Sequence, residues 1–338
     1  MGILIEKAGI FTTVQDLGRE GYQKMGFRVS GAMDRRACIV ANLLTGNDGT
    51  EATLEFVMQG PTIVFGEDTV IALCGGEFGA LLNGSAIAND IACQVHKGDR
   101  LELGYVRKGN YGYLAVRGGL DVPEVMGSRA TDVKCRLGGY QGRKLQDGDR
   151  IELLPVKQTG PAAGKCKAPK ANALTGHRNT NREKDAALVP ETWRNKETSV
   201  ILRVVLGPQD DHFTREGIQT FATQEYTVTD QCDRMGFRLD GSEIKHNEKG
   251  ADIISDGIAF GSIQVPSHGK PIIMMADRQT TGGYAKIATV ISTDLPKLAQ
   301  CRPGGRVRFR IVSVEEAQFH YRMEQEEYRK LKEKLTLM

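Results

Sequence analysis

The chain of 338 residues lacks the features that mark several specialised classes of protein. No apolar run approaches the roughly 18 residues of a membrane-spanning helix, and the first residues show no apolar stretch behind a positive start, as a secretory signal would. The net charge is only +3, with acidic residues mixed among basic ones, which argues against a nucleic-acid binder. These absences predict a cytoplasmic protein that binds neither nucleic acid nor membranes.

Cysteine and histidine are too scattered to predict a metal site or a redox pair. The seven cysteines include no C-x-x-C pair and no cluster with histidine. In a cytoplasmic protein these thiols are expected to be reduced. The sequence also contains no G-x-S-x-G and no H-E-x-x-H. We therefore predict no metal ligands and no catalytic set that is complete within this chain.

Glycine is abundant where proline is scarce. The chain has 40 glycines and 11 prolines, a balance that favours tight turns and close backbone approaches over disorder. Its apolar stretches are short, and Gly, Pro, Asn or Asp bound them, as is typical of β-strands. We predict a mainly β (α+β) fold with two β-barrel-like lobes and a few short helices.

A change in composition divides the chain. Residues 156–196 have almost no apolar periodicity and predict an exposed linker between an N-terminal β-rich lobe, 1–155, and a C-terminal lobe, 197–312. Residues 313–338 predict a helix, because Ser313 and Glu316 fit a capping box. Another helix is predicted after residue 30, capped by Ser30 and ended by Gly46.

One octapeptide occurs twice. "KMGFRVSG" at 24–31 and "RMGFRLDG" at 234–241 are identical at five of eight positions. Together with other landmarks in the same order, this predicts a structural duplication in which the copies occupy equivalent corners of similar barrels. The alternative is coincidence between turns of similar chemistry.

Five stretches combine glycine with arginine, aspartate, glutamine and threonine. Such loops can direct backbone N–H groups and guanidinium groups at an anion, although each can also be a hairpin turn with solvated flanks. They span residues 14–34, 116–132, 136–145, 206–213 and 261–287. In the last stretch an apolar strand runs into "ADRQTTGGY", which predicts a recognition loop.

Nine motifs occur in the order seen in one protein family. They are QDLGREGY, SGAMD, VRGG, GSRATD, GGYQGR, GPQDD, DRMGFRLDG, GSIQVP and ADRQTTGGY. On these motifs the chain resembles the family of 5-oxoprolinase C subunits, whose members have also been labelled allophanate hydrolase subunit 2, biotin-dependent carboxyltransferase and antagonist of a sporulation-kinase inhibitor. The resemblance runs from about Ile5 to Val312. The long linker, the "GFRVSG" segment and the charged tail depart from the family pattern.

The resemblance implies a cyclophilin-like β-barrel architecture and an obligate partner. It implies that the chain acts with a kinase-inhibitor-like protein, the B subunit, using ATP and Mg²⁺ shared with that protein, to phosphorylate 5-oxoproline. The A subunit then completes ring opening to L-glutamate. Two alternatives stay open. One is biotin-dependent carboxyl transfer to urea or a related amide, with biotin on another chain, and the other is non-enzymatic antagonism of a histidine-kinase inhibitor.

The matching motifs supply the candidate site residues. Asp277, Arg278 and Gln264 are the predicted catalytic residues, with Gln141 and Gln264 suited to the amide group of a lactam or urea. The residues predicted to bind substrate or nucleotide are Asp34, Arg35, Arg117, Arg129, Gly138, Gly139, Gln141, Arg143, Arg234, Gln279, Thr280, Gly282, Gly283 and Tyr284. Each has a structural alternative, because an Asp–Arg pair at a strand end often closes a turn.

Overall fold

The computed structural model describes residues 2–156, 188–194 and 199–337. It contains two compact units, each assembled from segments that are distant in sequence. The first comprises residues 1–19, 34–195 and 327–338, and the second comprises residues 20–33 and 196–326. They divide the chain differently from the predicted lobes, because residues 20–33 belong to the second unit and the predicted C-terminal helix is shared between the two units.

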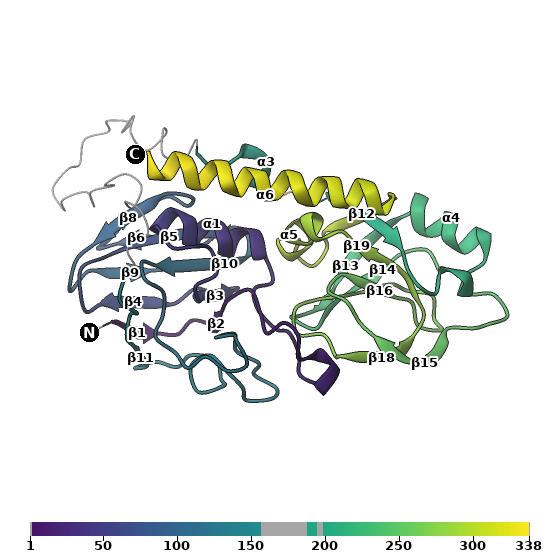
Figure 1. Ribbon diagram of the computed structural model, residues 1–338, viewed down its shortest axis with the longest axis horizontal. Helices are drawn as coiled ribbons and strands as arrows, with labels where there is room; N and C mark the ends of the chain where they lie inside the picture. The colour runs from purple at the N-terminus through teal and green to yellow at the C-terminus, as the bar shows by residue number, and fades with distance from the viewer. Residues whose placement is uncertain (1, 157–187, 195–198, 338) are drawn as a thin grey trace. The chain divides into compact units, whose positions relative to one another are not determined.

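The first unit is built from two antiparallel sheets (Figure 1). The six-stranded sheet follows the order β11 (Arg150–Ile151), β1 (Ile3–Lys7), β4 (Thr62–Phe65), β9 (Arg100–Glu102), β6 (Leu81–Leu82) and β7 (Ser85–Ala86). The five-stranded sheet follows the order β2 (Phe11–Gln15), β3 (Thr53–Val57), β10 (Lys108–Val116), β5 (Thr69–Glu77) and β8 (Ala92–Val95).

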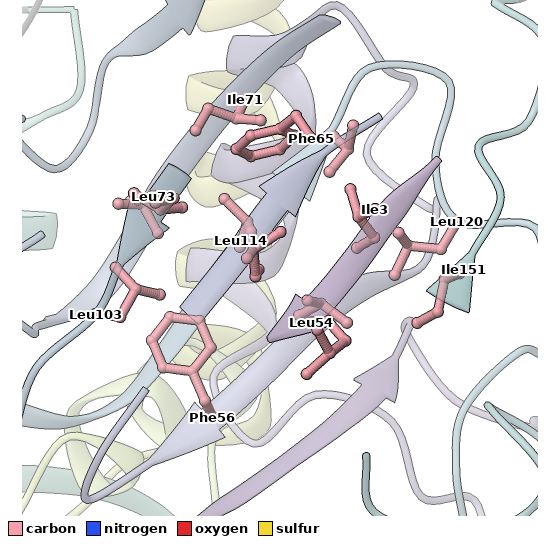
Figure 2. Close-up of a cluster of buried hydrophobic side chains, with 14 of the residues drawn as sticks. Ile3, Leu54, Phe56, Phe65, Ile71, Leu73, Leu103, Leu114, Leu120 and Ile151 are labelled. Atoms are coloured by element: carbon pink, nitrogen blue, oxygen red, sulfur yellow. The ribbon is translucent and has the colours of Figure 1, made fainter. Parts of the chain in front are cut away.

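Both sheets contribute to one hydrophobic core (Figure 2). Ile3 and Phe65 come from the six-stranded sheet and meet Leu54 and Leu114 from the five-stranded sheet, all at most 2% exposed. Burial of apolar side chains on this scale is the main force that holds such a pair of sheets together. Helix α1 (Arg35–Thr45) packs against β5 and β10.

The second unit contains a closed seven-stranded barrel. Its order is β12 (Ser199–Leu206), β19 (Lys286–Val290), β16 (Ser262–Gln264), β17 (Ile272–Met274), β14 (Gly236–Asp240), β13 (Glu225–Cys232) and β20 (Arg306–Ile311). The parallel pair β12–β20 closes it, and the other neighbours are antiparallel. Beside the barrel, β15 (Asp252–Gly257) and β18 (Thr281–Tyr284) form a two-stranded ribbon.

Short helices complete the described chain. They are η1 (Gln23–Met25), α3 (Glu191–Arg194), η2 (Asp210–His212), α4 (Arg215–Thr223), η3 (Ser292–Asp294) and α5 (Leu295–Ala299), followed by the longer α6 (Val314–Thr336). Within the described residues, no helix combines the length and the apolar character that crossing a membrane requires.

The mainly β prediction is confirmed. Of the two predicted barrel-like lobes, the second is found as the closed barrel, whereas the first unit consists of two separate sheets. The C-terminal helix is confirmed with its cap, because the Glu316 N–H donates to Ser313 Oγ at 3.2 Å. Gly46 ends α1 with a φ of 82°, as predicted. The start of that helix was placed wrongly, since Asp34 and not Ser30 caps it. Most of the predicted linker lies outside the described residues.

The two octapeptides do not occupy equivalent places. In the first copy, 24–31, the end of η1 is followed by irregular chain, whereas the second copy, 234–241, forms strand β14. Both copies also belong to the second unit. The prediction of matching barrel corners is therefore wrong, because the same letters adopt irregular chain in one copy and a strand in the other.

Candidate functional site

A pocket of about 370 Å³ opens against the barrel of the second unit. Strands β13, β14, β16 and β17 contribute to it, together with the segment that leads into the ribbon. Its lining residues are Asp230, Gln231, Cys232, Asp233, Met235, Gly236, Arg238, Gln264, Ile272, Met274, Gln279 and Tyr284. Three predicted site residues, Gln264, Gln279 and Tyr284, thus come together in one cavity.

The floor of the pocket is the outer face of the barrel. On β14, Phe237 and Leu239 are at most 2% exposed and fill the interior, whereas Arg238 between them is exposed, as expected from the two-residue period of a strand. Arg238 is the cross-strand partner of Ile272, and Ile272 is the partner of Gln264. These three side chains therefore form a row on the same outer face.

The loop after β17 is held by an ion pair. Arg234 donates through Nε to Asp277 Oδ2 at 2.8 Å and through Nη2 to Asp277 Oδ1 at 2.9 Å. The same Nη2 donates to the Gly31 carbonyl at 2.7 Å. Arg234 is 8% exposed and Asp277 is 9% exposed, so water has little access to the pair. The two hydrogen bonds between them make the pair bidentate. Asp277, a predicted catalytic residue, thus fixes the base of the loop.

Arg278 and Gln23 hold the same loop from two sides. Arg278 donates through Nε to the Ile258 carbonyl at 2.9 Å and lies over the Phe260 ring, 5.6 Å from its centroid. Gln23 donates through Nε2 to the carbonyls of Ile258 and Thr280 at 3.0 and 2.9 Å. The predicted residues Arg278 and Thr280 therefore take part in backbone anchoring, and Gln279 between them is presented to the pocket.

The ribbon closes one side of the pocket, and Gly282 is required for its close approach. A Cβ at Gly282 would lie 2.7 Å from both Gln264 Nε2 and Ile258 Cδ1. Gln264 Nε2 donates to the Tyr284 carbonyl at 3.4 Å. Gly283 has more space, because a Cβ there would lie 3.5 Å from its nearest neighbour atom.

A buried lysine ties the ribbon to the barrel. Lys286, 2% exposed, is the cross-strand partner of Gln264, and its ammonium donates to Asp256 Oδ2 at 3.1 Å. This hydrogen bond is the largest cause of a lowered pKa at Asp256. Gln209, from the "GPQDD" motif, donates to the same carboxylate oxygen at 3.4 Å.

The turn between β13 and β14 borders the pocket with acidic groups. Asp233 Oδ1 accepts hydrogen bonds from the N–H groups of Met235 and Gly236 at 2.7 and 3.1 Å. Burial, and then the charges of Asp233 and Asp230, raise the pKa of the Cys232 thiol. The thiolate is the reactive form of cysteine, so this environment disfavours a nucleophilic role for Cys232.

Three predicted residues of the first unit make hydrogen bonds within that unit. Asp34 caps α1 by accepting from the Ala37 N–H at 2.9 Å. Arg129 donates to Glu124 at 3.1 Å, and Arg143 makes a bidentate pair with Asp149 at 2.7 and 2.8 Å.

The remaining candidates of this unit lie at turns and element ends. Gly138 and Gly139 have φ values of 66° and 52°, and a Cβ on either would overlap Ala130 or Thr131. Gln141 also has a positive φ, 57°, and its Oε1 accepts from Arg143. Arg35 is the first residue of α1, and Arg117 directly follows β10.

Residues of this site that were not predicted include Gln23, Asp233, Arg238 and Lys286. Arg238 could have been found, because "GFRLD" alternates apolar and polar residues and so places Arg238 on the face opposite Phe237 and Leu239. Gln23 carried no such signal, since its partners are 235 and 257 residues away.

Comparison with known proteins identifies relatives over nearly the whole chain. The family model described as carboxyltransferase domain, subdomain A and B, matches residues 25–311. The C subunit of 5-oxoprolinase from Escherichia coli strain K12 is 37% identical over 96% of this chain and 95% of its own length. That of Haemophilus influenzae is 33% identical over 90% of this chain and 89% of its own length.

Larger proteins contain a similar region. The urea amidolyase of Saccharomyces cerevisiae is 31% identical over 93% of this chain, which covers 17% of that protein. The crystal structure of the Kluyveromyces lactis urea amidolyase matches with a TM-score of 0.85 and 28% identity, over 98% of this chain and 20% of that one. The chain thus spans no more than a fifth of these urea amidolyases.

Proposed function

The chain belongs to the family of carboxyltransferase domains with subdomains A and B, and from that premise we propose that it is the C subunit of an ATP-dependent 5-oxoprolinase. In this role it acts with the kinase-inhibitor-like B subunit to phosphorylate 5-oxoproline, and the A subunit completes ring opening to L-glutamate. The end-to-end match with the C subunit of the E. coli 5-oxoprolinase carries the proposal, because it leaves neither protein with a large unmatched region.

The pocket on the barrel supports this role through its chemistry. A side-chain amide has both a carbonyl oxygen and N–H donors, so Gln264 and Gln279 complement the two polar groups of a lactam. Ile272 and Met274 add apolar surface suited to ring methylene groups. We assign amide recognition to the two glutamines. Asp277 and Arg278, whose contacts anchor the loop, act as positioning residues.

We propose that the site for ATP and magnesium is shared with the B subunit. Among the described residues of this chain, no three His, Cys, Asp or Glu side chains gather where a metal ion could be held. Of the four arginines Arg117, Arg129, Arg143 and Arg234, each predicted to bind substrate or nucleotide, the last three pair with carboxylates of their own chain. We therefore propose that the B subunit supplies most of the nucleotide site. ATP would activate the lactam carbonyl, which is a poor electrophile when unstrained.

Turnover by the assembled proteins tests the proposal. The chain is co-expressed with the B subunit, and ADP release is measured with 5-oxoproline, with urea and with no substrate. We expect ADP release that depends on 5-oxoproline, and glutamate once the A subunit is added. The absence of turnover together with tight binding between the two proteins would replace the proposal with antagonism of a kinase inhibitor.

Carboxyl transfer is the second candidate, and the family description and the likeness to urea amidolyase favour it. Under this alternative the pocket holds urea or a related amide, and another chain provides carboxylated biotin. The same assay separates the two candidates. Consumption of urea that requires a biotinyl protein would support carboxyl transfer, and turnover of 5-oxoproline without biotin would exclude it.

A further inference from the structure

The pocket contains one guanidinium with no partner among the described residues. Arg238 lines the pocket from β14, and none of the described carboxylates pairs with it. Other arginines on the barrel differ: Arg203 binds Asp294, and Arg308 binds Glu225. A guanidinium is always charged and presents a fork of N–H donors that matches a carboxylate. Arg238 is therefore a cation available to a ligand.

The register of the barrel places this cation at a useful distance from the amide-binding residues. Arg238 and Gln264 are separated by one strand, because both are cross-strand partners of Ile272. Neighbouring strands lie about 4.8 Å apart, so the two backbones are roughly 10 Å apart. A single small ring between their side chains can contact both, with the apolar side chain of Ile272 below it.

The acidic residues near Arg238 make its positive charge important for binding an anionic ligand. Asp230 and Asp233 also line the pocket, and Asp233 already accepts two backbone N–H groups of the β13–β14 turn. Their negative charges oppose the entry of an anion. Among the lining residues Arg238 carries the only positive charge. Whether the pocket accepts an anionic substrate therefore depends on Arg238.

We propose that Arg238 binds the substrate carboxylate and makes the pocket selective for small lactams or amides that carry one. This inference rests on the proposed function and deepens it. A 5-oxoproline molecule presents its carboxylate to Arg238 and its lactam group to Gln264, whereas urea is neutral and leaves Arg238 unused. Arg238 thereby makes the pocket bind a lactam with a carboxylate more tightly than a neutral amide.

Paired ligands and matched variants test the inference in the complex with the B subunit. The ligands are 5-oxoproline and 2-pyrrolidinone, which is the same ring without the carboxylate. Binding of each is measured by calorimetric titration, and the KM and kcat for 5-oxoproline are measured in parallel. The variants are Arg238→Gln, Arg238→Lys and the control Arg310→Gln, whose guanidinium lies on β20 outside the pocket.

We expect Arg238→Gln to weaken 5-oxoproline binding and raise its KM by about tenfold to a hundredfold, with kcat nearly unchanged. Binding of 2-pyrrolidinone should not change, Arg238→Lys should recover part of the loss, and Arg310→Gln should behave as wild type. An unchanged affinity for 5-oxoproline, or an equal loss for both ligands, would overturn the inference. If the wild-type complex binds 5-oxoproline through Arg238 but does not release ADP, the proposed reaction fails and the inference stands.

Discussion

The two units contain similar glycine- and arginine-rich loops, but these loops serve different ends. In the first unit, Arg129 and Arg143 pair with carboxylates nearby in the sequence, and the glycines of the "GGYQGR" stretch make close turns. In the second unit, Arg234 and Arg278 are equally engaged, yet they anchor the loop that presents Gln279 to the pocket. The presence of an ion pair therefore does not by itself tell what an arginine does. Its role depends on which loop the ion pair holds in place.

The largest expected effect compares one ion pair from each unit. Arg234→Met leaves Asp277 nearly buried without its cation, so we expect the free energy of unfolding to fall by about 3–5 kcal/mol and 5-oxoproline turnover to be lost. In Arg143→Met the guanidinium that is removed is more exposed, 27% of its side chain against 9% for Arg234, and the expected loss is about 1 kcal/mol with turnover retained. Urea unfolding and ADP release measure both. Equal loss of turnover in the two variants would contradict the comparison.

A second ion pair of the barrel separates stability from activity within the second unit. Burial raises the pKa of Asp294, but hydrogen bonds from Arg203 and Lys297 outweigh it and leave that pKa below its ordinary 3.8. Because the pKa is lower in the folded state, the stabilisation is present above about pH 4 and is lost as the pH falls through the folded pKa.

Asp294→Asn should therefore lower the free energy of unfolding at pH 7 by about 3 kcal/mol. At pH 3 the variant and the wild type should differ less, as measured by urea unfolding at both values. Since Asp294 does not line the pocket, the KM for 5-oxoproline should stay the same. A gap in stability that is as large at pH 3 as at pH 7 would refute the assignment.

Two glycines of the ribbon give a matched comparison of smaller size. Gly282→Ala places a methyl group against Gln264 and Ile258, so we expect a cost of about 1–3 kcal/mol and a raised KM. Gly257→Ala on the other strand meets no atom within 4 Å and should be close to neutral. Thermal unfolding and steady-state kinetics of the two variants provide the test. A neutral Gly282→Ala would show that the ribbon moves away from the pocket without cost.

The last comparison concerns Gln23, where we expect the smallest effect on turnover. Gln23→Leu removes two hydrogen bonds to the loop, each worth about 1 kcal/mol. We expect a severalfold rise in KM for 5-oxoproline, and partial recovery in Gln23→Asn, whose shorter side chain keeps the amide. If stability falls while KM is unchanged, Gln23 supports the fold without positioning Gln279.

The sequence predicted local elements better than it predicted contacts. The cap of α6 at Ser313, the stop of α1 at Gly46 and the strands around "PIIMMAD" follow from residues close to one another. Asp277 was placed in the right loop, but its role could not be inferred, because its partner Arg234 lies 43 residues earlier. The alternation around Arg238 was visible in the sequence, whereas the register that aligns it with Gln264 depends on barrel closure.

The anchoring of Gln23 also has a consequence for synthesis of the chain. Its two hydrogen-bond partners are added 235 and 257 residues later, and β20, which closes the barrel, comes later still. At typical translation rates, on the order of 10 to 50 seconds pass between synthesis of Gln23 and synthesis of the two residues that accept its hydrogen bonds. During that interval the segment around Gln23 has left the ribosome without its native surroundings.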